Sequence, residues 1–143
     1  MLITGGSRGI GQALVSHLLP DWNIVFTGRS EAGIGRTLAQ ARKLHTSTWV
    51  KGYRCDGRDE GNVQRLAMSL LDEFGAPAAI IHNAGMTRDA LHIHQTARDW
   101  QDVLTNNLVA LVNWNRILLH AMMRQGRGAI ALMSSVTAVT GNS

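Results

Sequence analysis

Residues 4–11 read Thr4-Gly5-Gly6-Ser7-Arg8-Gly9-Ile10-Gly11, and they join a short apolar run to a segment of helical periodicity. Glycine permits a positive φ and adds no side chain, so backbone N–H groups at such a turn can approach an anion closely. The stretch lacks the Gly-Lys-Ser/Thr sequence of a nucleoside-triphosphatase loop, which excludes that class. It predicts a phosphate-binding turn at a helix N-terminus, with a plain tight turn as the alternative.

The rest of the chain alternates between short apolar runs and amphipathic segments. Strands are predicted at residues 2–4, 23–27, 46–54, 78–81 and 129–133. Helices are predicted at residues 10–18, 34–45, 59–75 and 96–126, the third capped by Asp59 and the fourth opened by Thr96-x-x-Asp99. Gly33-Ile34-Gly35 is interpreted as a loop that enters the second helix. This order predicts one α/β domain, residues 1–143, with a doubly wound parallel sheet and helices on both faces.

Composition narrows the class of protein further. Of the 143 residues 45% are hydrophobic and 17% charged, which is typical of a globular chain. No apolar run is long enough to span a bilayer, and the first residues do not resemble a signal peptide, so no membrane association is expected. A single cysteine, Cys55, excludes an internal disulfide and favours a cytoplasmic location.

The net charge of +4 comes from twelve arginines and two lysines against ten acidic residues. The arginines are scattered and form no basic run with interleaved aromatic residues, so no nucleic-acid partner is expected. Four histidines, His17, His45, His92 and His94, lack the spacing of metal ligands, so they are interpreted as exposed polar side chains. No metal site is predicted.

Five ordered motifs resemble those of the short-chain dehydrogenase/reductase family, and together they cover essentially the whole chain. They are Gly5-x-x-x-Gly9-x-Gly11, Cys55-Asp56, His82-Asn83-Ala84-Gly85, Asn107-Leu108 and Ser134-Ser135-Val136. The third motif has histidine where the family has asparagine. The resemblance implies a Rossmann fold, incomplete here at its C-terminal end, and a nicotinamide dinucleotide cofactor.

The second predicted strand ends in Thr27-Gly28-Arg29-Ser30, without the carboxylate that usually binds the ribose hydroxyls of NAD. Arg8 and Arg29 can bracket a 2′-phosphate, so NADP(H) is expected, although Arg29 alone could be a surface arginine. The resemblance implies that Asp56 accepts a hydrogen bond from the adenine amino group. The predicted cofactor-binding residues are Gly5, Ser7, Arg8, Gly9, Ile10, Gly11, Arg29, Asp56, Asn83, Ala84 and Gly85.

The resemblance also implies catalytic residues. Ser135, with Ser134 as the alternative, would orient the substrate carbonyl, and Asn107 rather than Asn106 would hold a water in a proton relay. The family's Tyr-x-x-x-Lys falls beyond Ser143, and the one tyrosine, Tyr53, is predicted to be a strand side chain. The chain is therefore expected to be the N-terminal part of a longer reductase. A truncated, non-catalytic dinucleotide-binding module is the alternative.

Residues 84–91 read Ala84-Gly85-Met86-Thr87-Arg88-Asp89-Ala90-Leu91. They resemble the Ala-Gly-x-Thr-Arg-Asp-x-Leu segment of the 3-oxoacyl-acyl-carrier-protein reductases of fatty-acid synthesis. The implied reaction is NADPH-dependent reduction of a 3-oxoacyl thioester, held on acyl carrier protein, to the 3-hydroxyacyl form. A reductase for another ketone or alcohol is the alternative.

Two partners follow from the same resemblance. An acidic carrier protein would suit the basic surface at Arg124 and Arg127, although cations there also complement the dipole of a helix C-terminus. The family forms dimers and tetramers, so a homo-oligomer is expected. Its surface would use the apolar stripe Trp114, Leu118, Met122 and Met123, for which a core within one chain is an equally good account.

Overall fold

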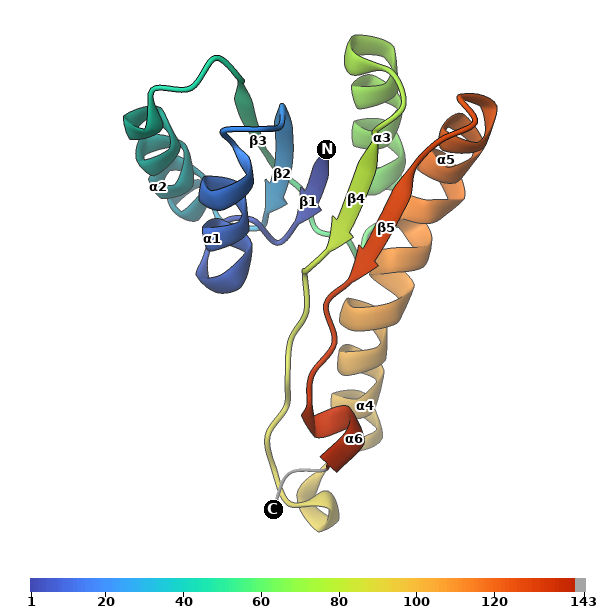
Figure 1. The fold of residues 1–143 in the computed structure, drawn as a ribbon. Coiled ribbons are helices and arrows are strands. Elements are labelled where there is room, and N and C mark those ends of the chain that lie inside the picture. The colour runs from blue at the N-terminus through green and yellow to red at the C-terminus, as the bar shows by residue number, and fades with distance from the viewer. Residues whose placement is uncertain (141–143) are drawn as a thin grey trace.

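The computed structural model describes residues 1–140 and contains a five-stranded parallel sheet with connecting helices (Figure 1). The strands are β1 (Leu2–Thr4), β2 (Ile24–Gly28), β3 (Val50–Arg54), β4 (Ala79–His82) and β5 (Ala129–Leu132). The helices are α1 (Gly9–Leu18), α2 (Glu31–Ala41), α3 (Glu60–Phe74), α4 (Ala97–Leu104), α5 (Ala110–Arg124) and α6 (Thr137–Thr140). A turn of π-helix, Thr105–Val109, joins α4 to α5.

The strand order is β3-β2-β1-β4-β5, and every pair is parallel. The chain runs outward from β1 to β3 and then crosses back to β4, so the order reverses between β1 and β4. Ligands of open α/β sheets bind outside the carboxyl ends of the strands at such a reversal. The predicted doubly wound fold is confirmed, and the glycine-rich stretch follows the central strand at this edge.

Two apolar layers hold the helices against the sheet. On one face α1 and α2 pack on β1 and β2, with Phe26 and Ile3 fully buried. On the other face α3 and α5 pack on β1, β2 and β4, with Trp114 and Leu118 almost fully buried. Trp114, Leu118 and Met122 therefore belong to the core of this chain, which confirms the single-chain alternative for these three residues. Met123 is exposed.

Helix ends follow the local signals in the sequence. The Asp59 side chain accepts a hydrogen bond from the backbone N–H of Asn62 at the start of α3, and Gly75 ends that helix with a φ of +74°. Thr96 and Asp99 form the predicted capping box of α4, each side chain accepting from the other's backbone N–H. These predictions are confirmed because each depends on residues within one turn.

The predicted ends of helices and strands differ from the observed ones where contacts between separate elements determine them. Gly33 and Gly35 lie inside α2, not in a loop before it, and an added Cβ on Gly33 would meet the Ser7 carbonyl oxygen at 3.1 Å. Glycine thus lets α2 approach the glycine-rich loop. The second helix ends before residue 45, because His45 takes a left-handed φ of 46° after a short 3-10 turn.

The third strand begins at Val50 rather than at residue 46. The hydroxyls of Thr46 and Thr48 hydrogen-bond to each other, and Thr48 also donates to the Leu19 carbonyl. These side-chain bonds fix residues 46–48 in a turn. Sheet pairing starts only after Trp49, whose carbonyl accepts from Ile24 N–H at 2.9 Å.

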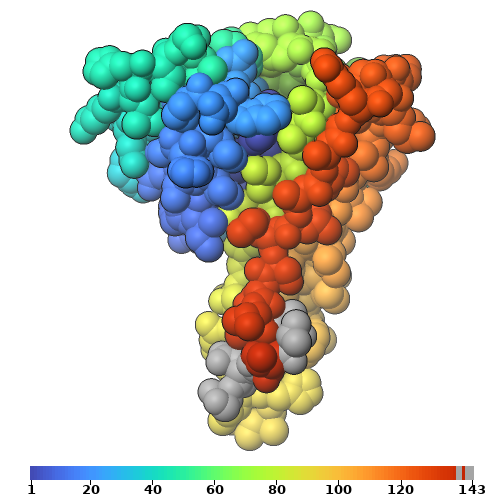
Figure 2. Space-filling view, viewed as in Figure 1, coloured from blue at the N-terminus to red at the C-terminus, as the bar shows by residue number. Residues whose placement is uncertain are grey.

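Below the sheet, the loop after β4, α4 and the segment after β5 form a narrower extension (Figure 2). It lies on the carboxyl side of the strands, where the order of the sheet reverses. No helix within residues 1–140 has both the length and the apolar character needed to cross a membrane.

Candidate functional site

The loop between β1 and α1 has the conformation that its glycines predict. Gly5 and Gly9 take positive φ values of 70° and 53°. An added Cβ on Gly11 would lie 2.2 Å from the Gly5 carbonyl oxygen and 2.4 Å from Asn83 Nδ2, so only glycine fits there. Around Gly9, by contrast, an added Cβ would meet no described atom within 4 Å apart from its chain neighbours and its own helix backbone. The loop is tightly packed at Gly11 and open at Gly9.

The N-terminus of α1 faces this open side. Arg8 is the N-cap residue with an extended backbone, and no side chain of residues 1–140 caps the first turn. The first N–H groups of the helix, with the positive end of its dipole, therefore remain available to an anion. Arg8 and Ile10 are exposed beside them. The arrangement fits a pyrophosphate in both shape and charge.

The carboxyl end of β4 supports the glycine-rich loop. Asn83 Nδ2 donates to the carbonyls of Thr4 and Gly5 at 3.2 and 3.1 Å. The hydroxyl of Thr4 in turn accepts from the backbone N–H groups of Asn83 and Ala84, at 3.2 and 3.1 Å. Asn83 thus fixes the loop through bonds within the protein. Gly85 and Ala84 are exposed at the same edge.

Asn107 lies in the π-helical turn, a feature found frequently at functional sites. Its amide donates to the Met86 carbonyl and accepts from the Met86 N–H, each at 2.9 Å. The neighbouring Asn106 instead donates to the carbonyl of Asp102 in its own helix at 2.8 Å. Of the two asparagines, Asn107 is therefore the one whose side chain bonds to the segment that follows β4.

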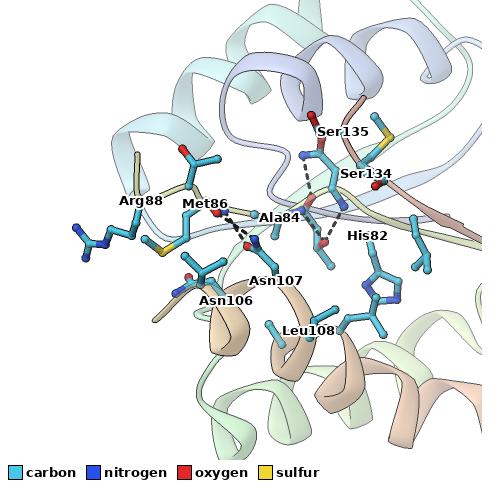
Figure 3. A pocket seen from close by; sticks show the side chains of 18 of the residues that line it. His82, Ala84, Met86, Arg88, Asn106, Asn107, Leu108, Ser134 and Ser135 are labelled. Atoms are coloured by element: carbon cyan, nitrogen blue, oxygen red, sulfur yellow. Dashed lines mark hydrogen bonds between the residues drawn. The ribbon is translucent and has the colours of Figure 1, made fainter. Parts of the chain in front are cut away.

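These elements enclose a pocket of about 970 Å³ (Figure 3). Its lining includes Arg8 and Ile10 of the glycine-rich loop, residues 82–88, Asn106 and Asn107, and both Ser134 and Ser135. In Figure 3 the two serines lie on the opposite side of the pocket from the two asparagines. Ser135 is exposed, and its hydroxyl is 2.8 Å from that of Thr137. The structure thus brings the residues predicted for catalysis to one cavity with part of the predicted cofactor set.

Arg29 and Asp56 lie farther along the same edge of the sheet, at the ends of β2 and β3. Arg29 is exposed, and its charge helps to lower the pKa of the Asp56 carboxyl. The main cause of that lowering is the hydrogen bond from Arg58. Neither Arg29 nor Asp56 lines the 970 Å³ pocket. The predicted cofactor residues therefore extend from this pocket outward to β3.

Two side chains that stabilise the site, Thr37 and His82, were given no role in the sequence analysis. The Thr37 hydroxyl, fully buried in α2, is 3.2 Å from the carbonyls of Gly6 and Gly33, so it ties α2 to the glycine-rich loop. His82 is buried, with Nε2 2.9 Å from Asn115 Oδ1 in α5, and burial lowers its pKa. His82 could have been identified from the sequence, because it replaces the asparagine of the family motif. No feature of the sequence around Thr37 indicates its contact with the loop.

The predictions for Tyr53 and for the exposure of the four histidines are confirmed. Tyr53 lies in β3 and packs against the core. The four histidines named above are exposed, and residues 1–140 contain no group of His, Cys, Asp and Glu suited to a metal ion. Burial raises the pKa of the Cys55 thiol to about 11, so the thiol stays protonated at neutral pH and is a poor nucleophile.

Comparison with known proteins agrees with this geometry. A family model described as short chain dehydrogenase matches residues 1–143. The 3-oxoacyl-[acyl-carrier-protein] reductase FabG of Vibrio cholerae is 31% identical over 99% of this chain, and that of Escherichia coli is 30% identical. Nodulation protein G of a Rhizobium species is 33% identical. The chain spans 56% of the length of each of these relatives.

Solved structures share the fold at lower identity. Levodione reductase has a TM-score of 0.92 and 24% identity, with 99% of this chain and 56% of that chain covered. L-Sorbose reductase from Gluconobacter frateurii, complexed with NADPH and L-sorbose, has a TM-score of 0.90 and 24% identity over 99% of this chain and 54% of that one. The sheet order, the glycine-rich turn and the match over the whole sequence agree, so the chain belongs to the short-chain dehydrogenase family.

Proposed function

We propose that this chain is the cofactor-binding part of an NADPH-dependent reductase that converts a 3-oxoacyl thioester on acyl carrier protein to the 3-hydroxyacyl form. The observation that carries the proposal is the pocket shared by the glycine-rich loop, Asn107 and Ser135. A dinucleotide and a carbonyl substrate must meet in one cavity for hydride transfer, and this cavity has groups suited to both. The family membership supports the reaction class.

The adenosine end of NADP(H) would follow the edge of the sheet. The pyrophosphate would lie on the open N-terminus of α1 near Gly9, and Arg8 and Arg29 would bind the 2′-phosphate. Two guanidinium groups attract a dianion, whereas the carboxylate typical of an NAD site would repel it. Ala84 and Gly85 are exposed where the cofactor would pass β4. The cofactor would supply the hydride that reduces the carbonyl carbon.

The chain's own residues would polarise the substrate and support proton transfer. The Ser135 hydroxyl would donate a hydrogen bond to the carbonyl oxygen, stabilising the negative charge that develops there. The side-chain amide of Asn107 is already bonded to the Met86 backbone. A water in the proton relay would therefore bind the backbone carbonyl of Asn107 instead. The π-helical turn favours this role, because a change in helical hydrogen bonding can leave a carbonyl without an N–H donor. The proton donor itself is expected in the family's Tyr-x-x-x-Lys, beyond residue 143.

The substrate class rests on residues 84–91 and on relatives named as 3-oxoacyl-[acyl-carrier-protein] reductases. Five residues of this segment line the pocket: Ala84, Gly85, Met86, Thr87 and Arg88. Arg88 is paired with Asp102 at 3.2 Å, so the segment is tied to α4. We further propose a homo-oligomer in the cytoplasm, with Arg124 and Arg127 as a docking surface for the acidic carrier protein.

The test is NADPH oxidation by the protein at its full length, followed by absorbance, with a 3-oxoacyl thioester as substrate. We expect Ser135→Ala to lower kcat by about a hundredfold while leaving the Kd for NADPH unchanged, because one donor to the developing oxyanion is lost. Ser134→Ala is the matched variant and should have a much smaller effect. NADPH binding without turnover of any thioester would favour the non-catalytic module, and turnover of an unrelated ketone alone would refute the substrate class.

The choice of cofactor has its own test. Replacing Arg8 and Arg29 together by glutamine should weaken NADPH binding by at least about tenfold and leave NADH binding almost unchanged, because only the 2′-phosphate is lost as a partner. Isothermal titration with both nucleotides measures the two constants. Equal losses for NADPH and NADH would argue against the proposed 2′-phosphate site.

A further inference from the structure

The turn between β3 and α3 holds a close pair of charged side chains, Asp56 and Arg58. Arg58 Nε lies 3.0 and 3.1 Å from the two carboxylate oxygens of Asp56, and its Nη2 lies 2.6 Å from Oδ2. The backbone N–H of Arg58 also donates to Oδ1 at 3.1 Å. Because the partners are two residues apart, these bonds fix the carboxylate relative to the turn itself.

Hydrogen bonds also fix this β3–α3 turn to neighbouring elements of the fold. Cys55 N–H donates to the Gly28 carbonyl at 2.9 Å, which joins the end of β3 to the end of β2. The buried Asn113 of α5 donates from Nδ2 to the Gly57 carbonyl, also at 2.9 Å. Hydrogen bonds to Cys55 and Gly57 therefore fix the backbone on both sides of Asp56. Arg58 then determines how the Asp56 carboxylate is oriented.

This carboxylate remains an open, anionic acceptor. The bonds from Arg58, with a contribution from Arg29, hold the pKa of Asp56 below its usual range. About a third of the Asp56 side chain is exposed. An ionised carboxylate has about four acceptor positions. Arg58 makes four contacts with the two oxygens but brings only three N–H groups, because its Nε–H is shared between Oδ1 and Oδ2. Three hydrogens do not fill four positions, so the equivalent of one position is left for an outside donor.

The strand order indicates what that donor is. Along the edge of the sheet, the ends of β1, β2 and β3 present the glycine-rich loop, Arg29 and Asp56 in that order. A dinucleotide that has its pyrophosphate on the loop and its 2′-phosphate near Arg29 would bring its base to Asp56 next. Adenine offers a donor, the exocyclic amino group, where hypoxanthine offers an oxygen that a carboxylate repels.

We infer that Arg58 is a positioning residue for recognition of the adenine base, because it orients Asp56 so that the remaining acceptor position meets the amino group. The inference rests on the proposed function, since it assumes NADP(H) as the ligand. It predicts that discrimination between adenine and hypoxanthine depends on a side chain that does not itself bind the base.

The test compares the Kd for NADPH with that for its hypoxanthine analogue, by isothermal titration of the full-length protein. We expect the unaltered protein to favour NADPH by at least about tenfold, the size of one hydrogen bond to a charged group. In Arg58→Met the ratio should fall below about threefold, because the carboxylate is no longer oriented. Arg58→Lys, which keeps the charge but lacks the fork, should lie between the two.

Arg116→Met is the matched control. Arg116 forms an equally short ion pair, 2.6 Å to Glu60 at the start of α3, and that pair is more exposed than the one between Arg58 and Asp56. Its loss should leave the ratio of the two constants unchanged. Thermal unfolding of each variant shows that the fold is retained, which is expected because Arg58 is 41% exposed.

Three results would overturn the inference. If Arg58→Met keeps the full preference for adenine, or binds NADPH more tightly because Arg58 had blocked the acceptor, the proposed function stands and the role of Arg58 is refuted. If the unaltered protein binds neither nucleotide, the proposed function fails, and the role of Arg58 fails with it.

Discussion

Asn107 holds the backbone of Met86 by two hydrogen bonds, one in each direction and each 2.9 Å long. The two residues are 21 positions apart, and their contact joins the π-helical turn to the segment after β4. An added Cβ on Gly85 would lie only 3.4 Å from the Asn107 amide oxygen. The asparagine that family resemblance assigns to catalysis is thus also a structural link across the pocket.

Replacing Asn107 by alanine should lower the free energy of unfolding by about 2 kcal/mol, because both backbone groups of Met86 lose a partner in a half-buried site. Urea denaturation measures the change. Asn106→Ala is the control, since among residues 1–140 its amide bonds only to the Asp102 carbonyl one turn earlier. It should change stability by less than about 0.5 kcal/mol. Equal effects of the two substitutions would contradict a special role for the Asn107–Met86 link.

Gly11→Ala should disrupt the glycine-rich loop, because its Cβ would lie 2.2 Å from a backbone oxygen that cannot move without the loop. We expect a loss of at least about 2 kcal/mol in stability and a large loss of NADPH affinity. Gly35→Ala is the matched substitution in α2, where the added Cβ would meet no described atom within 4 Å apart from its chain neighbours and its own helix backbone. It should stabilise the protein by about 0.5–1 kcal/mol, as alanine does in an open helical position.

Thr37→Val should weaken cofactor binding from a distance. The substitution keeps the volume of the side chain but removes the hydroxyl that donates toward the Gly6 carbonyl at 3.2 Å. Thermal unfolding should show a loss of about 1–2 kcal/mol, and titration a raised Kd for NADPH. Thr37→Ser keeps the hydroxyl and should keep the Kd even though it loses packing. If serine and valine raise the Kd equally, packing rather than the hydrogen bond positions the loop.

His82 should make stability depend on pH. Burial lowers its pKa in the folded protein below the unfolded value of 6.5. The unfolded chain therefore binds more protons just below pH 6.5, so the free energy of unfolding should fall as the pH drops through that range. One group contributes at most about 1.4 kcal/mol per pH unit.

The comparison for His82 is His82→Asn, which places the family's residue at this position. Subtracting its denaturation free energies from those of the unaltered protein, between pH 7.5 and 5, isolates the histidine, because every other titrating group is common to the two proteins. A difference that does not change with pH would show that His82 titrates alike in both states.

Much of the fold could be predicted because its signals are local. The glycine-rich turn, the Asp59 cap, the end of α3 at Gly75 and the capping box at Thr96 each involve residues within one or two turns of chain. Predictions that depended on which distant segment a residue packs against were less accurate. The sequence alone did not show that Gly33 lies inside a helix packed on Ser7, or that Trp114 lies in the core of this chain.

The sequence by itself therefore determined the order of strands and helices along the chain, the anion-binding turn and the basic residues beside it. Tertiary structure decided that Asn83 supports Gly5 from 78 positions away, that Asn107 holds Met86, and that Thr37 reaches the loop. The physical reason is that caps and turns are satisfied by neighbours along the chain, whereas buried polar groups take partners that only the packed sheet and helices bring within hydrogen-bond distance.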